Sequence, residues 1–388
     1  MRRQYWAILF AIIFMVIWFI SLIVTTISLD KVIASSSIQS TPSTDVSSSY
    51  QQNDDIAIDI PGVELQLPLP NRDDVPIQVV YTNYTTITTL HNEPSKGIVL
   101  ILHACSHSAL KFFTSSPDCK SCIGLSEELR IVRLVIQYGY TPIAISSINR
   151  VNGCWSNKDI PRIQTVLNYW SKHQYHQHEH QKVKHTVYAI GASSGGSFAS
   201  QLLVNNIVDG TLVMVMSLTN NIVKRLKEEP LKSLYLAPMP RDINTLKRCE
   251  QNYHDLITSS TSNRMKEYII LDTTTCKPIP VTASYLVQRI PHMTNNHANH
   301  LIQLLKQANH IDKITNMLLV DPTKSNWRDI LTKNNITNDK STYWLGLYDL
   351  TPGISQVAKA LHRAWAYHEY CSEVVLPALR FFEHPVKV

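Results

Sequence analysis

The stretch VYAIGASSGGSFASQLL, residues 187–203, places three glycines within six residues around a pair of serines. Gly191-Ala192-Ser193-Ser194-Gly195 fits G-x-S-x-G, the pattern of a nucleophilic serine on a tight turn from a strand to a helix. Side chains two residues before and after the serine would collide across that turn, so glycine is favoured at both positions. We therefore predict that Ser193 is a nucleophile, while a register shifted by one residue would assign Ser194.

Short apolar runs alternate with helical stretches on both sides of this turn. The predicted strands are 77–82, 97–105, 141–148, 185–192, 211–218 and 265–272, and the predicted helices are 124–139, 160–173 and a segment from about Gly195. Continuous apolar strands alternating with helices are typical of a mostly parallel sheet covered on both faces. Right-handed crossovers then give a doubly wound α/β fold.

Two segments resemble motifs of the α/β-hydrolase superfamily. YAIGASSGG (188–196) is similar to its nucleophile elbow, and VLILHACSH (99–107) is similar to its oxyanion loop. The resemblance covers residues 75–385 and implies an α/β-hydrolase-type fold with oxyanion donors at the backbone N–H groups of Cys105 and Ser194. This chain departs from the superfamily by having Ala104 where a glycine usually follows the histidine.

A longer segment narrows the resemblance. HACSHSALKFFTSSPDCKSCIGLSEELRIVRLVIQYGYTPIAISS (103–147) resembles a little-characterised eukaryotic, membrane-anchored subgroup of the superfamily. The superfamily orders its triad as serine, acid and then histidine, with the histidine near the C-terminus before a last helix. In AWAYHEYCSEVVLPALRFFE (364–383) this implies His368 as the base, and His362 is its competitor.

The acid is expected after the strand that follows 211–218. MKEYIILDTTTCKPIP (265–280) contains one carboxylate near that strand end, Asp272, which we assign as the acid. The superfamily's acid usually lies a few residues past the strand, nearer Thr275, so Asp321 and Asp349 remain open as alternatives.

Histidines near the site allow two interpretations. His103 and His107 flank the oxyanion loop, where they either line the substrate pocket or form structural hydrogen bonds. The histidine-rich tract 173–185 lacks neighbouring Asp or Cys ligands, so a solvated loop is favoured over a metal site. We predict no metal and no cofactor.

The N-terminus predicts a membrane anchor. No charge lies between Arg3 and Asp30. This run is long enough for a helix that spans a bilayer, which needs about 20 apolar residues. Residues 1–30 are therefore assigned as a transmembrane signal-anchor with a cytoplasmic N-terminus. A cleavage pattern at Val32 and Ala34 is the alternative, and it gives a secreted protein. The Ser/Thr-rich residues 31–55 predict a flexible stalk.

The remaining chain is then lumenal or extracellular. Two glycosylation sequons begin at Asn83 and Asn335. All seven cysteines follow the apolar segment, which allows up to three disulfides and one leftover thiol. For Cys119-Lys-Ser-Cys122 a local disulfide is favoured over a metal site.

Residues 56–388 are predicted to form the α/β-hydrolase domain, with possible cap insertions at 221–264 and 291–340. The net charge of +6 without a basic block does not indicate a nucleic-acid partner. We expect a membrane-anchored serine hydrolase, similar to esterases or lipases, that acts on a small-molecule or lipid ester. A non-catalytic binding domain and a serine peptidase are the competing hypotheses, and the oligomeric state is not predicted.

Overall fold

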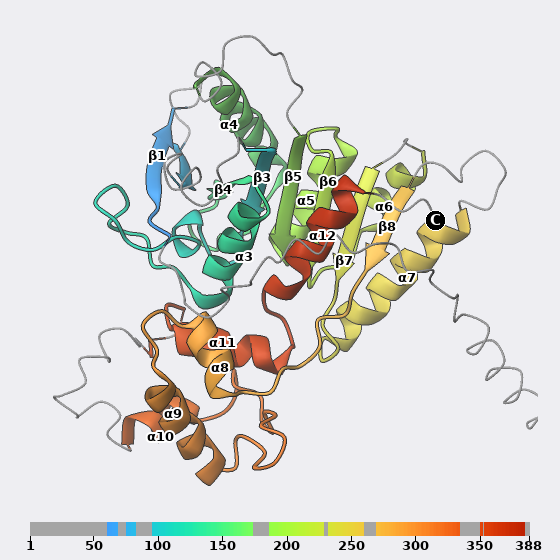
Figure 1. Ribbon diagram of the computed structural model, residues 1–388. Coiled ribbons are helices and arrows are strands. Elements are labelled where there is room, and N and C mark those ends of the chain that lie inside the picture. Colours follow the sequence, from blue (N-terminus) through green and yellow to red (C-terminus); the bar gives the residue numbers. More distant parts are fainter. Residues whose placement is uncertain are drawn as a thin grey trace, which may run out of the picture. The chain divides into compact units, whose positions relative to one another are not determined.

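The computed structural model describes residues 60–68, 75–82, 95–173, 186–228, 232–259, 269–333, 350–351 and 353–384 (Figure 1). Within these residues one eight-stranded sheet has the order β1-β2-β4-β3-β5-β6-β7-β8. The strands are β1 (Val63–Leu67), β2 (Ile77–Tyr81), β3 (Gly97–Leu102), β4 (Thr141–Ile145), β5 (Thr186–Ala192), β6 (Gly210–Met214), β7 (Lys232–Ala237) and β8 (Ile269–Thr273).

The sheet is mostly parallel, as predicted. Only the pairings of β1 with β2 and of β2 with β4 are antiparallel. All residues of β3, β4, β6 and β7 are buried, which explains why apolar side chains dominate these strands, apart from Lys232 and Ser233 at the start of β7. The parallel register pairs Leu102 of β3 with Gly191 of β5, and Ala192 of β5 with Met214 of β6, at the carboxyl edge of the sheet.

Helices cover both faces of the sheet. Alternate residues of β3 face opposite sides, so that Val99 and Ile101 pack in one apolar cluster while Ile98 and Leu100 pack in the other. The first cluster contains α3 (Ser126–Gln137) and α12 (Val375–Glu383), and the second contains α4 (Ile160–His173), α5 (Ser194–Val204), α6 (Asn220–Glu228) and α7 (Ile243–Ser259). The doubly wound prediction is therefore confirmed.

A helical module lies between β8 and α12 in the sequence. Its helices are α8 (Ala283–Arg289), α9 (Asn295–Gln307), α10 (Trp327–Lys333) and α11 (Gln356–Trp365), and they share an apolar cluster of their own (Figure 1). The described part of the predicted insertion 291–340 lies in this module. The predicted insertion 221–264 is wrong, because it contains β7, which pairs with β6 and β8 inside the sheet.

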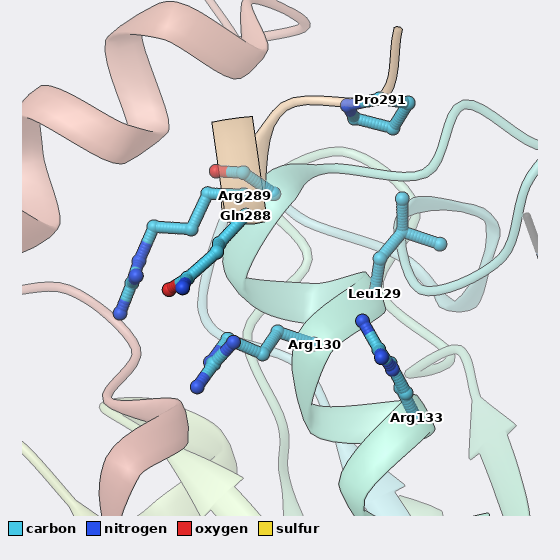
Figure 2. A pocket seen from close by; sticks show the side chains of 7 residues that line it. Leu129, Arg130, Arg133, Gln288, Arg289 and Pro291 are labelled. Carbon is cyan, nitrogen blue, oxygen red and sulfur yellow. The ribbon is translucent and has the colours of Figure 1, made fainter. Parts of the chain in front are cut away.

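A buried ion pair joins the helical module to α3. Arg289 at the end of α8 donates to Glu127 of α3 over 2.7 Å and also pairs with Glu373. Figure 2 shows this junction, where Arg130 and Arg133 of α3 and Gln288 and Arg289 of α8 line a small open pocket. Removal of one partner of the Arg289–Glu127 pair would leave the other charge buried and uncompensated, which is strongly destabilising.

Three disulfides and one free thiol confirm the cysteine prediction. Cys119 pairs with Cys122 as a local bridge, Cys105 pairs with Cys154, and Cys276 pairs with Cys371. Cys249 is free and buried. The Cys276–Cys371 bridge joins the two ends of the segment that contains the helical module, because Cys276 follows β8 and Cys371 precedes α12.

Some of the predicted features lie outside the described residues. These are the anchor 1–30, the stalk 31–55, the sequons at Asn83 and Asn335, and the histidine tract beyond His173. In the part of the chain that the structure describes, we find no helix with the length and apolarity needed to cross a bilayer.

Candidate active site

Ser193 lies on a strained turn between β5 and α5. Its backbone angles are φ 53° and ψ −120°, a region that side chains rarely occupy, and its N–H donates to Met214 O over 3.0 Å. The flanking glycines are a steric necessity: a Cβ at Gly191 would lie 2.2 Å from Gly195 O, and a Cβ at Gly195 would lie 2.2 Å from Leu102 O. The crowding that the sequence predicts across this turn is confirmed.

Ser193 and His368 form a hydrogen bond. The Oγ of Ser193 lies 3.0 Å from Nε2 of His368, which sits in the loop after α11. The other ring nitrogen, Nδ1, lies 2.8 Å from Oδ2 of Asp242. A carboxylate only accepts hydrogen bonds, so the proton belongs on Nδ1, and Nε2 is left to accept the serine proton. The His368 side chain is 39% exposed, which leaves the pair open to a substrate.

Asp242 is held at the start of α7. Its Oδ1 accepts a hydrogen bond from Thr245 N over 3.3 Å, so one carboxylate oxygen caps the helix while the other faces His368. The preceding residue, Arg241, donates to Trp365 O over 2.8 Å and stacks on the Trp365 ring. These contacts connect the turn that carries the acid to the loop that carries the histidine.

The predicted acid, Asp272, is not part of this network. It lies within β8, opposite Tyr235, and its Oδ1 accepts from the N–H of its own neighbour Thr273 over 2.7 Å. The assignment is therefore corrected to Asp242. The cause is a missed strand: β7 follows β6 directly, so the acid lies after β7 rather than after β8. The buried run KSLYLA (232–237) is the signal that would have found this strand.

Of the competing residues, the two that the structure describes, Asp321 and His362, make their contacts away from Ser193. Asp321 caps its own turn by accepting from Thr323, and Asp349 lies outside the described residues. His362 lies on α11, with Nδ1 3.7 Å from a carboxylate oxygen of Glu369. The Oγ of Ser194 is buried and makes no hydrogen bond within the described chain, so the geometry favours Ser193 in the choice of register.

The segment predicted to be an oxyanion loop follows the end of β3. Ala104 N–H donates to the Tyr370 hydroxyl over 2.7 Å, so this amide is occupied. The next amide, that of Cys105, has no acceptor among the described residues. Ser194 begins α5, so its N–H has no acceptor within the helix. A Cβ at Gly195 would lie 2.6 Å from His103 O, which places the start of α5 against this loop.

His103 holds the predicted oxyanion loop from inside the protein. Its Nε2 accepts from Ser147 N over 3.0 Å, so Nδ1 carries the proton and donates to Ala104 O over 2.9 Å. That carbonyl belongs to the same peptide unit as the Cys105 N–H. Burial lowers the pKa of His103 to about 4, which keeps the ring neutral. Of the two interpretations of His103, the predicted contact with substrate is corrected in favour of structural hydrogen bonds, because both ring nitrogens are bound within the protein.

His107 also turns away from the site. Its Nδ1 lies 3.0 Å from Cys105 O, and its Nε2 lies 3.5 Å from the fully buried carboxyl group of Glu128. Burial lowers the pKa of His107 to about 3. We therefore assign His107 a structural role instead of the predicted contact with substrate. Among the described residues, no three His, Cys, Asp or Glu side chains are grouped as metal ligands.

The strand order and the strained Ser193 turn define an α/β-hydrolase-type fold. The chain order Ser193, Asp242, His368 is the order of triad residues in that fold. No family model and no curated protein matches the sequence.

Solved structures similar to this chain share little sequence with it. An esterase of Pyrococcus furiosus, Pf2001, is 12% identical, with 63% of this chain and 90% of that chain covered at a TM-score of 0.36. A predicted CIB-like hydrolase from Thermoplasma acidophilum is 12% identical, with 55% and 86% covered at a TM-score of 0.35. A carboxyl esterase from Bacillus coagulans is 13% identical, with 43% and 48% covered at a TM-score of 0.28. The fold assignment therefore rests on the strand order and the Ser193 turn.

Proposed function

We propose that this chain is a serine hydrolase that cleaves a carboxylic ester through an acyl-enzyme. The observation that carries the proposal is the continuous hydrogen-bonded chain from Ser193 Oγ through His368 to Asp242. A serine hydroxyl is a weak nucleophile unless an adjacent base takes its proton, and a third group must orient that base. The three side chains supply these functions.

The reaction begins with attack of Ser193 Oγ on the ester carbonyl, while His368 Nε2 accepts the serine proton. Asp242 stabilises the imidazolium that forms. The N–H groups of Cys105 and Ser194 bind the oxyanion, and in comparable sites each such donor contributes about 3–4 kcal/mol. His368 then protonates the leaving alcohol, and a water molecule activated by the same base releases the acyl group.

We further propose that the hydrolase is anchored in a membrane by residues 1–30, with residues beyond Asp30 on the lumenal or extracellular side. The uncharged run after Arg2 and Arg3 supports this topology. Three disulfides fit an oxidising compartment. Deglycosylation should shift the gel mobility of the wild type, and this shift should be absent from the Asn83→Gln and Asn335→Gln double variant. A wild type whose mobility does not shift argues against the topology.

The test of the activity is labelling of the full chain by a fluorophosphonate, followed by peptide mapping. We expect the label on Ser193, no labelling of Ser193→Ala, and wild-type labelling of Ser197→Ala, a matched serine one turn further along α5. A folded wild-type protein that takes no label would overturn the proposal and favour a non-catalytic binding domain. Parallel assays with an ester and an amide of the same acyl group then distinguish esterase from peptidase activity.

A further inference from the structure

The four residues after His368 are each anchored to a different part of the molecule. Glu369 receives two hydrogen bonds from Lys359 of α11, over 2.8 and 3.1 Å. Cys371 is bridged to Cys276, and Ser372 donates to Glu127 of α3 from both N and Oγ. Tyr370 alone points from this segment to the oxyanion loop, where its hydroxyl accepts from Ala104 N–H over 2.7 Å.

The Tyr370 side chain has little freedom to move. It is 1% exposed, and its ring packs edge-on against Phe112 at a centroid distance of 5.7 Å. Its backbone N–H donates to Glu369 over 3.0 Å, so the carboxylate that binds Lys359 also fixes the main chain at Tyr370. The hydroxyl is therefore presented to Ala104 from a rigid support.

The contact acts on the peptide units that precede the oxyanion donor. Ala104 N–H is bound by Tyr370, while Ala104 O receives His103 Nδ1 at 2.9 Å and His107 N at 3.2 Å. With both polar groups of Ala104 held, the direction of the Cys105 N–H follows. Displacement of a catalytic group by about 1 Å costs about 10²-fold in rate. The hydrogen bonds that fix Ala104 therefore contribute to the rate by fixing the direction of the Cys105 N–H.

We propose that Tyr370 is a positioning residue that couples the loop of the general base to the oxyanion loop, so that one short segment sets both halves of the active site. The inference rests on the proposed function, because it assigns the Cys105 N–H to the oxyanion. His368 and Tyr370 are two residues apart, so any shift of this segment moves the base and the support of the oxyanion donor together.

The test compares Tyr370→Phe with Tyr285→Phe in the full chain. Tyr285 is the matched control, since it is 5% exposed and its hydroxyl donates to Ala360 O over 2.7 Å inside the helical module. We expect Tyr370→Phe to lower kcat for an ester about 10- to 100-fold, which does not exceed the loss caused by removal of an oxyanion donor. KM should stay unchanged within about twofold. Tyr285→Phe should leave both constants near wild type.

A thionoester substrate separates an oxyanion effect from a general loss of structure. Sulfur accepts hydrogen bonds poorly, so the wild type should strongly prefer the oxygen ester to its thiono analogue, and Tyr370→Phe should reduce this preference. The preference should stay unchanged in Tyr285→Phe. A Tyr370→Phe enzyme with wild-type kcat, or with a lower kcat but an unchanged oxygen-to-sulfur preference, would overturn the proposal.

Amide hydrogen exchange gives a readout that needs no activity. In Tyr370→Phe, peptides covering residues 103–110 should exchange faster than in the wild type, and they should be unaffected in Tyr285→Phe. If the wild type takes no fluorophosphonate, the proposed function fails, and the exchange data still decide whether Tyr370 holds the loop. Equal exchange in the wild type and Tyr370→Phe would refute the coupling whatever the activity.

Discussion

Oδ2 of Asp242 lies 2.8 Å from Nδ1 of His368, although 126 residues separate them in the chain. Asp242→Asn should therefore reduce ester hydrolysis about 10⁴-fold, because an amide in place of this carboxylate favours the wrong tautomer of the histidine. Asp272→Asn is the matched control and should retain wild-type kcat. The measurement is steady-state kinetics of both variants, and the reverse pattern would restore Asp272 as the acid.

The turn at Ser193 should not tolerate a methyl group at Gly195. A Cβ there would lie 2.2 Å from Leu102 O and 2.6 Å from His103 O, which are backbone atoms at the end of β3. We expect Gly195→Ala to reduce the rate of fluorophosphonate labelling by at least about 10²-fold, since displacement of the nucleophile is costly.

Gly353→Ala is the control for that substitution. Gly353 has φ +88°, and beyond its two chain neighbours no heavy atom of the described residues lies within 4 Å of the place that a methyl group would take, so an alanine meets backbone strain of about 1–2 kcal/mol. The Gly353→Ala substitution should lower the melting temperature slightly, and fluorophosphonate should label this variant at the wild-type rate. Equal labelling of Gly195→Ala and Gly353→Ala would show that the turn can relax.

The Cys276–Cys371 bridge should contribute more to stability than Cys119–Cys122. The two bridges have sequence separations of 95 and 3 residues. In the chain-entropy model, the paired serine variants should lose about 5 and about 2 kcal/mol of unfolding free energy, respectively. Denaturant unfolding of both variants tests the order, and equal losses would contradict it.

Stability should depend on pH through Glu128. This carboxyl group is fully buried and faces His107, Lys111, Lys359 and Glu369, and burial raises its pKa to about 8. Because the unfolded chain releases this proton near pH 4.5, the folded state binds more protons between about pH 4.5 and 8. The contribution of Glu128 to stability therefore falls as the pH rises through that range.

Glu128→Gln should remove this fall, because glutamine resembles the neutral acid. The melting temperature of the variant relative to wild type should rise steadily from about pH 5 to about pH 8. Glu369→Gln provides the contrast. Burial alone would raise the pKa of Glu369, but Lys359 lowers it overall, so this variant should be destabilised relative to wild type, and more so above about pH 4.5 than below. A Glu128→Gln difference that stays constant with pH would contradict the assignment.

The parts of the fold that the sequence predicts correctly are those with a strong local cause. The strands β3, β4, β5 and β6 are continuous apolar runs because they are buried on both faces, and the glycines around Ser193 follow from contacts within one turn. His368 is predicted from its place before the last helix, and the structure puts it 3.0 Å from Ser193 Oγ.

The acid and the role of His103 do not follow from the sequence in the same way. Assignment of the acid depends on the number of strands, and omission of β7 moves it one strand too far, from Asp242 to Asp272. The direction of the His103 side chain depends on Ser147 N–H, which is 44 residues away and is a backbone group that no residue type reveals. Both errors concern contacts between segments that are distant in the chain.

The Cys276–Cys371 bridge has a consequence for how this architecture can diversify. It holds the Cα atoms at the two ends of the excursion through α8–α11 at a separation of 6.3 Å. Because its two ends are joined, this helical segment can change in length or sequence without moving the residues where the chain leaves and re-enters the core. Evolution, or a grafting experiment, is therefore free to exchange α9 and α10 as a cassette, while Arg289 of α8 and Lys359 of α11 keep their contacts with the core and the His368 loop keeps its covalent tether.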